Sequence, residues 1–171
     1  MPASKDAIAL LKADHRKVEE LFDQYEKARG RKAEIAQQIC MELTIHTIIE
    51  EEIFYPACRE AGVEEDAMNE ANVEHDGAKV LIAELENGAP GEEFFDAKVK
   101  VLSEDIKHHV KEEEKRDGIF AQARAAEIDL EALGQEMMAR KEELKADFKE
   151  SGLPSPVMVT FKAGSLKRRA A

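Results

Sequence analysis

The sequence has no tryptophan and is poor in the residues that interrupt helices. Nine glycines and five prolines are spread through 171 residues, so the turn signals that they provide lie far apart. The dominant residues are Ala, Glu, Lys and Leu, which favour helices. The sequence contains no uninterrupted apolar run of the ~20 residues that a membrane-spanning helix requires. The first residues also lack the apolar core of an export signal, and we therefore expect an all-α protein of the cytoplasm.

Basic residues are outnumbered by acidic ones, and cysteine is scarce. The formal net charge of -12 argues against nucleic-acid binding and favours cations near the protein. Cys40 and Cys58 would lie roughly 27 Å apart on one helix at about 1.5 Å per residue, far beyond the ~7 Å Cα separation that a disulfide allows. We predict that both cysteines are packing residues and that neither forms a disulfide or a thiolate metal site.

Apolar residues recur every three or four positions along four segments, which predicts four amphipathic helices. Their expected spans are residues 4–29, 32–60, 64–86 and 92–125. The first helix would begin at the N-cap Ser4, and Asp117 and Gly118 would disturb the last turns of the fourth. Because the connections are short, we expect an up-down-up-down four-helix bundle over residues 4–125.

Two further segments follow the predicted bundle. A helix without histidine is expected within residues 126–150, with Asp129 as its N-cap. Residues 151–171 form a short, proline-led tail, for which we expect either a surface strap or disorder. The predicted fold class is therefore an all-α four-helix bundle with an additional C-terminal helix and a short tail.

One histidine interrupts the apolar stripe of each predicted bundle helix. In the second helix the inward positions are expected to be Ile39, Leu43, His46, Glu50, Ile53 and Ala57. The fourth helix repeats this arrangement with His109 and Glu113, so in both helices a histidine stands one turn before a carboxylate. An ionised carboxylate in an apolar stripe is costly unless a positive group meets it.

The inward polar residues of the four helices are expected to meet at one depth in the bundle. These six residues are His15, His46, Glu50, His75, His109 and Glu113. A single histidine on an apolar face is usually a core residue, but four of them with two carboxylates predict a metal site. Nitrogen and oxygen donors without thiolate favour iron, manganese, zinc or copper over calcium or magnesium. Six donors exceed the needs of one tetrahedral zinc, whereas two ions bridged by the carboxylates would use them all.

The spacing of these residues resembles that of the hemerythrin-like, HHE cation-binding domains. The similarity covers residues 4 to about 125 and includes the phrases Glu-Glu-Glu-Ile-Phe-Tyr-Pro from Glu50 and His-His-Val-Lys-Glu-Glu from His108. The resemblance implies a four-helix bundle that holds two iron ions with an oxo or hydroxo bridge and engages O2 or a related small ligand. It also implies that the six inward residues are the metal ligands.

The sequence departs from oxygen-carrying hemerythrins at two places. Those proteins have a second histidine one turn from the third-helix ligand, where this chain has Ala71 and Lys79, and an aspartate in the fourth helix, where this chain has Glu113. One iron would therefore lose a terminal nitrogen ligand. Water or one of four side chains would fill the gap: Glu70, Glu74, Tyr25 or Tyr55.

Three functions are compatible with this pattern. The first is a di-iron protein that holds or senses O2, or buffers iron; the second is a di-iron oxidoreductase acting on peroxide or nitric oxide; the third is a structural zinc or mixed-metal bundle. Hydrolytic catalysis has no support, because no Ser or Cys is paired with an inward histidine. An enzymatic role is thus left open. His108 and the acidic neighbours of Glu50 and Glu113 are predicted to be solvated or to accept hydrogen bonds from the ligand imidazoles.

Overall fold

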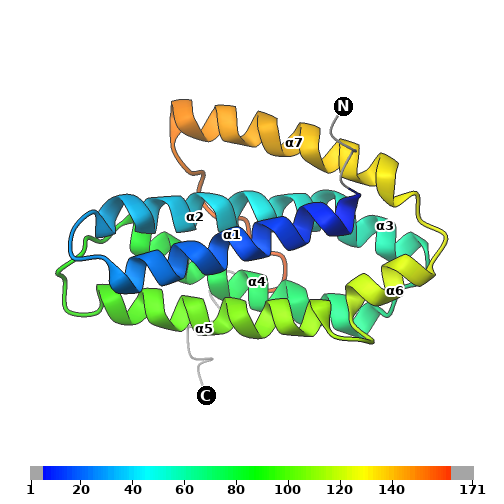
Figure 1. The fold of residues 1–171 in the computed structure, drawn as a ribbon, viewed down its shortest axis with the longest axis horizontal. Helices are drawn as coiled ribbons and strands as arrows, with labels where there is room; N and C mark the ends of the chain where they lie inside the picture. Colours follow the sequence, from blue (N-terminus) through cyan, green and yellow to red (C-terminus); the bar gives the residue numbers. More distant parts are fainter. Residues whose placement is uncertain (1–5, 163–171) are drawn as a thin grey trace, which may run out of the picture.

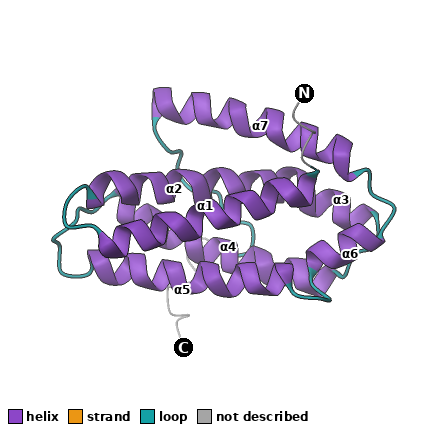
Figure 2. Cartoon of the chain, in the orientation of Figure 1, coloured by secondary structure: helices purple, strands orange, loops and turns teal. Residues whose placement is uncertain are grey.

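The computed structural model describes residues 6–162, and all regular secondary structure in this range is helical, as predicted. The elements are α1 (Ala7–Lys27), α2 (Lys32–Ile49), the π-helical turn η1 (Glu50–Phe54), α3 (Tyr55–Glu60), α4 (Glu65–Glu86), α5 (Phe95–Glu114), α6 (Ile119–Ala125) and α7 (Leu130–Ser151). Figures 1 and 2 show α1, α2, α4 and α5 side by side, with α7 lying across one face. Within the described range, no helix is long and apolar enough to span a membrane.

Four helices form a closed ring in which consecutive helices are neighbours. Helix α1 packs on α2 and α5, and α4 packs on α5 and α2, which is the arrangement of an up-down-up-down bundle. The predicted cap Ser4 lies outside the described residues. The cap observed at α1 is Asp6, whose carboxylate accepts a hydrogen bond from the Ala9 amide at 2.7 Å. The predicted cap Asp129 does accept from the Ala132 amide, at 3.0 Å.

The second predicted helix contains a π-helical turn that changes which residues face inward. The Tyr55 amide donates to the Glu50 carbonyl, an i→i+5 hydrogen bond that accommodates one extra residue in the turn. The two predicted inward positions after Glu50 are therefore only half-buried: Ile53 packs at the edge of an apolar cluster, and Ala57 is partly exposed. Phe54, Tyr55 and Cys58 are fully buried in their place, because the extra residue rotates the chain after Glu50.

The fourth predicted helix is two helices. Helix α5 ends at Glu114 and α6 begins at Ile119, with the break at the Asp117-Gly118 pair. A Cβ on Gly118 would lie 2.4 Å from the Glu112 carbonyl oxygen and 2.5 Å from that of Glu113. Only glycine allows the chain to turn this closely over the end of α5. The turn brings Phe120 over the bundle, where its ring stacks on that of His15 with 5.6 Å between ring centroids.

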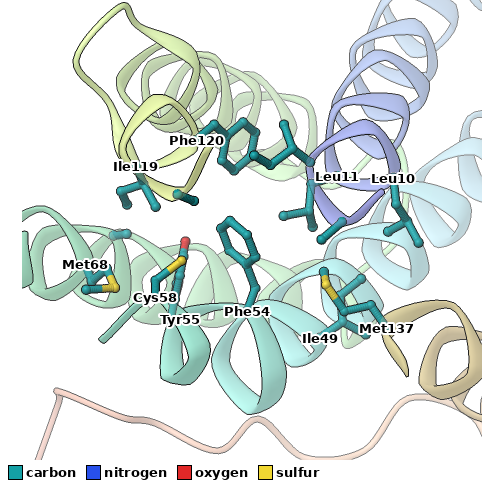
Figure 3. Packing of buried hydrophobic residues seen from close by; sticks show 14 of the residues in the cluster. Leu10, Leu11, Ile49, Phe54, Tyr55, Cys58, Met68, Ile119, Phe120 and Met137 are labelled. Carbon is teal, nitrogen blue, oxygen red and sulfur yellow. The ribbon is translucent and has the colours of Figure 1, made fainter. Parts of the chain in front are cut away.

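Two apolar clusters fill the two halves of the bundle. One combines the start of α1, the end of α2, α3, the start of α4, α6 and α7; in it Phe54 and Phe120 face each other edge to face, with Leu11 beside them (Figure 3). The other combines the opposite halves of α1, α2, α4 and α5. Cys40 and Cys58 are buried and free, one in each cluster, which confirms that they are packing residues.

The additional C-terminal helix and the tail also pack on the bundle. Helix α7 lies over α1 and α2 and buries Met137, Leu144 and Phe148. Residues 153–162 then return to α4, where the buried Asp76 carboxylate accepts hydrogen bonds from the backbone amides of residues 159–161 and from the Thr160 hydroxyl. In the part of the tail that is described, the chain is thus a surface strap; the basic residues 167–169 lie outside that part.

Replacing Gly118 tests the importance of the turn between α5 and α6. We expect Gly118→Ala to lower the free energy of unfolding by about 1–3 kcal/mol, because a methyl group there overlaps two carbonyl oxygens. Gly77 is the matched control, since it lies inside α4 with open space around its Cα. Gly77→Ala should raise the free energy of unfolding by about 0.5–1 kcal/mol. Urea denaturation followed by circular dichroism measures both, and equal stability of the two variants would contradict this account.

Candidate metal centre

The structure brings the six predicted residues into one buried layer between the two apolar clusters. Each is at most 5% exposed. Helices α1, α2, α4 and α5 each contribute one histidine, η1 contributes Glu50, and α5 contributes Glu113. The sequence placed all six correctly on the inward faces. Their role as metal ligands is a separate question, which depends on the geometry of the donor atoms.

The four imidazoles form two pairs. The Nε2 atoms of His15 and His46 are 3.2 Å apart, and those of His75 and His109 are also 3.2 Å apart. The two carboxylates lie between the pairs. Glu50 Oε2 is 3.2 Å from His46 Nε2 and 3.3 Å from His75 Nε2.

Glu113 occupies the equivalent place on the other side of the layer. Its Oε2 is 3.3 Å from His15 Nε2 and 3.5 Å from His109 Nε2. Each carboxylate therefore contacts one histidine of each pair. Two groups of donor atoms result, one from His15, His46, Glu50 and Glu113 and the other from Glu50, His75 and His109.

Each imidazole also has a carboxylate on its outer side, near Nδ1. The distances from Nδ1 are 2.7 Å for His15 to Glu114, 3.6 Å for His46 to Asp14, 3.1 Å for His75 to Glu51 and 2.7 Å for His109 to Glu74. A proton on Nδ1 satisfies such a carboxylate and leaves the Nε2 lone pair free. Two Nε2 lone pairs only 3.2 Å apart repel each other unless a cation or a proton lies between them.

The unsatisfied polar atoms of the layer fit a bound cation. Among the described residues, four buried side-chain atoms have no hydrogen-bond partner: Asp14 Oδ2, His46 Nδ1, Glu50 Oε1 and Glu113 Oε2. Two of them belong to the carboxylates between the histidine pairs. Buried polar groups are nearly always paired, and a set of imidazole nitrogens and carboxylate oxygens is suited to a transition metal.

The charges of the layer stabilise one another strongly. Burial lowers the pKa of His46, but the Glu50 and Asp14 carboxylates outweigh it and raise that pKa to about 10. Burial likewise lowers the pKa of His75, which Glu50 and Glu51 raise to about 9. Burial raises the pKa of Glu50, yet His46 and His75 hold it well below its usual range. The carboxylates thus attract positive charge into the layer, either protons or metal ions.

A lysine, an arginine or a histidine contacts each of the four outer carboxylates on its far side. Lys141 Nζ contacts Asp14, and Lys79 Nζ lies 2.9 Å from both oxygens of Glu51. The other two pairs are Arg16 with Glu114 at 2.6 Å and His108 with Glu74 at 3.3 Å. Lys141 and Asp14 are buried, so α7 supplies a charge to the interior that sequence analysis missed. Glu52 and Glu112, by contrast, pair with Arg140 and Lys115 at the surface.

The two third-helix positions that depart from the family pattern have separate roles. Lys79 donates to Glu51, to Asp76 and to the Val157 carbonyl. These hydrogen bonds fix the strap beside Glu51, the carboxylate that faces His75. Ala71 lines a cavity of about 80 Å³ that reaches Glu113 and His109. A larger cavity of about 620 Å³ lies between α2, α4 and the strap. One of its lining residues is Glu51, the outer carboxylate that faces His75.

Of the four side chains considered as a replacement for the missing histidine, only Tyr55 reaches the inner carboxylates. Its hydroxyl donates to Glu113 Oε1 at 2.7 Å and lies 3.4 Å from Glu50 Oε2. Burial and the two carboxylates raise its pKa well above the usual range, so the phenol keeps its proton. The Tyr25 hydroxyl instead donates to Asp96 at 2.6 Å, and Glu70 is exposed at the surface.

The fold and the buried histidine–carboxylate layer define a cation-binding helical bundle, and comparison with known proteins identifies its family. The model of the hemerythrin HHE cation binding domain matches residues 6–118. The chain therefore belongs to the hemerythrin HHE cation-binding family. It is also similar to the crystal structure of a hemerythrin HHE cation binding domain-containing protein from Mycobacterium kansasii, with a TM-score of 0.72 and 25% identity over 86% of this chain and 94% of the other. A comparison with curated proteins gave no significant match.

The raised histidine pKa values predict how pH affects the metal-stripped protein. The pKa values of His46 and His75 are above the unfolded value of 6.5, so their contribution to stability is fully present below about pH 6.5 and is lost as pH rises towards 9–10. The melting temperature of stripped protein should fall across this window. Metal replaces the protons, so the gain in melting temperature on adding metal should grow with pH. A gain that shrinks from pH 7 to pH 10 would contradict this prediction.

The buried Lys141–Asp14 pair predicts a large effect of a substitution in α7. Removing Lys141 leaves Asp14 charged and unpaired beside His46, so Lys141→Ala should lower the free energy of unfolding by about 3–5 kcal/mol. The double variant Lys141→Met/Asp14→Asn should recover most of that loss. Lys145→Ala is the control, because Lys145 lies one turn further along α7 and, among residues 6–162, forms an ion pair with Glu142 alone; it should change stability by less than about 0.5 kcal/mol. The pair is unimportant if both lysine variants unfold alike in urea.

Proposed function

We propose that this protein is a non-heme di-iron protein that binds or senses O2 or a related small ligand. The observation that carries the proposal is the pairing of the four imidazoles by two shared carboxylates. His15 and His46 would hold one ion, His75 and His109 the other, and Glu50 and Glu113 would bridge them. A structural zinc normally has four protein ligands of its own, whereas shared carboxylates are typical of paired metal ions in helical bundles.

The surrounding residues support a centre for a small molecule. Bound iron would supply redox chemistry and open coordination positions. The outer carboxylates hold the imidazole rings in one orientation and one tautomer, which raises their strength as ligands. The apolar clusters on both sides keep bulk water away from the layer. The donor set thus binds the ions firmly without filling every position around them.

Tyr55 favours a second candidate, the turnover of peroxide or nitric oxide. Its hydroxyl donates a hydrogen bond towards the inner carboxylates, 2.7 Å from Glu113 Oε1. A fixed hydrogen-bond donor beside a reacting peroxide stabilises the negative charge that develops on it, and removing one such donor typically slows a reaction by about 10²–10³-fold. A protein that only binds O2 has no such rate to lose. The two candidates therefore predict different consequences of removing one hydroxyl group.

Metal content and a visible spectrum test the di-iron proposal directly. Protein purified in air should contain about two irons per chain, in keeping with the two donor groups, and should show charge-transfer absorption. His109→Ala should lose iron. A colourless protein that contains zinc and no iron would overturn the proposal and support the structural alternative.

The Tyr55→Phe variant separates binding from turnover, with Tyr25→Phe as the matched control. Both variants should keep their iron, because neither phenol is needed to fill the histidine pairs. If the protein turns over peroxide, Tyr55→Phe removes a fixed hydrogen-bond donor and should slow the loss of added peroxide about 10²-fold, whereas Tyr25→Phe should not. A reversible O2 complex of unchanged stability in both variants, without peroxide loss, identifies the protein as a binding protein or sensor.

A further inference from the structure

A second group of metal-ligating side chains lies at the surface, directly outside the buried layer. Glu70 and Glu74 stand one turn apart on α4, and His108 approaches them from α5. One donor atom from each residue lies within 4.8 Å of the others. His108 Nε2 is 3.3 Å from Glu74 Oε1. A nitrogen and two carboxylates in this arrangement are suitable ligands for a divalent transition metal.

Glu74 connects this surface group to the buried layer. Its Oε1 faces His108 at the surface, while its Oε2 accepts a hydrogen bond from His109 Nδ1 at 2.7 Å. His108 is 58% exposed, Glu74 is 22% exposed, and His109 is buried. Three adjoining side chains thus form a continuous row of donor groups from solvent to the centre.

A cavity lies beside Glu74 and His109 of this row. Its volume of about 80 Å³ is enough for several water molecules. The walls include Glu70 and Glu74 at the outside and His109 and Glu113 at the inside. Glu113 Oε2 is among the buried atoms that have no hydrogen-bond partner within residues 6–162. A cation that has passed the outer carboxylates therefore reaches a wall residue, Glu113, that has an unpaired carboxylate oxygen to offer on the side of the histidines.

Ala71 keeps this cavity open. It is buried in the cavity wall between Glu70 and the inner residues, at one of the positions where the sequence has no second histidine. The mouth is acidic, with Glu64, Glu112 and Asp117 in the wall as well, and its one lysine, Lys115, is paired with Glu112 at 2.7 Å. The electrostatic potential at the mouth of the cavity is therefore negative, so it attracts cations and repels anions.

We infer that Glu70, Glu74 and His108 form a surface capture site for divalent metal ions, which reach the buried layer through the cavity beside Ala71. This inference rests on the proposed di-metal function, because it assigns the route by which that centre is filled. The captured ion exchanges the Glu70 and His108 ligands for His109 and Glu113 as Glu74 turns from the outer to the inner side. The ion remains divalent throughout, so the step needs neither an oxidant nor a reductant.

The test is the rate at which metal-stripped, full-length protein takes up Co²⁺ without air. Stopped-flow absorbance reports the Co²⁺ bands that develop in the buried site. Glu70→Gln and His108→Gln should each slow uptake about tenfold at limiting Co²⁺ and reach the same final absorbance as the unmodified protein. Glu104→Gln, an exposed carboxylate elsewhere on α5, removes the same charge and should leave the rate within twofold.

A second variant tests the cavity without changing any charge. Ala71→Val narrows the passage, so it should slow Co²⁺ uptake while the final amount of bound Co²⁺ stays the same. The capture site is refuted if Glu70→Gln and His108→Gln load as fast as Glu104→Gln, or if they lower only the final amount. In that case the buried centre still stands. If the unmodified protein takes up no Co²⁺ at all, the proposed di-metal function fails together with the uptake route.

Discussion

Two carboxylates, Glu50 and Glu113, are buried in the middle of a helical bundle, and the rest of the structure compensates their charge. Four imidazoles surround them, and four outer carboxylates face the imidazoles. Lys141, Lys79 and Arg16 place a positive charge beside three of these outer carboxylates. The sign of the charge alternates outward from the centre, so each shell offsets the desolvation of the one inside it. The charge of the two inner carboxylates is fully compensated when a positive charge lies between the Nε2 atoms. Either protons or metal ions can supply that positive charge.

This alternation also explains why the elements outside the four bundle helices are needed. Helix α7 supplies Lys141 to Asp14, and the strap after it is held by Asp76 and by Lys79, which binds Glu51. On the other side, α6 returns Phe120 over the His15 ring because Gly118 allows a close turn. The remaining two outer carboxylates, those of Glu114 and Glu74, are contacted by the surface-exposed side chains of Arg16 and His108. The four outer carboxylates are therefore not held alike. The contacts of Asp14 and Glu51 are anchored by later parts of the chain, whereas those of Glu114 and Glu74 are with side chains that are open to solvent.

The sequence was sufficient to predict the helical class, the bundle and the inward position of all six central residues, because the period of apolar residues is regular around each of them. The prediction failed where local geometry departs from a regular helix. The π-helical turn buries Tyr55 completely and leaves Ile53 only half-buried, and a backbone hydrogen bond of this kind leaves no trace in residue spacing. Lys141 was detectable, since it stands in phase with Met137 and Leu144 on the apolar stripe of α7. Its partner Asp14 was not, because contacts between distant segments depend on the packing of whole helices.

The anchoring of Asp14 and Glu51 by α7 and the strap has a consequence for the order of events during synthesis. The four bundle helices leave the ribosome before Lys141 and before the strap residues that bind Asp76 and Lys79. Until then, Asp14, which faces His46 Nδ1, lacks the Lys141 cation, and Lys79, which binds the Glu51 carboxylate beside His75, lacks its contact with the strap. The late parts of the chain therefore reach one histidine of each pair. Translation order thus places the contacts that brace His46 and His75 after the synthesis of the four helices that carry the histidines.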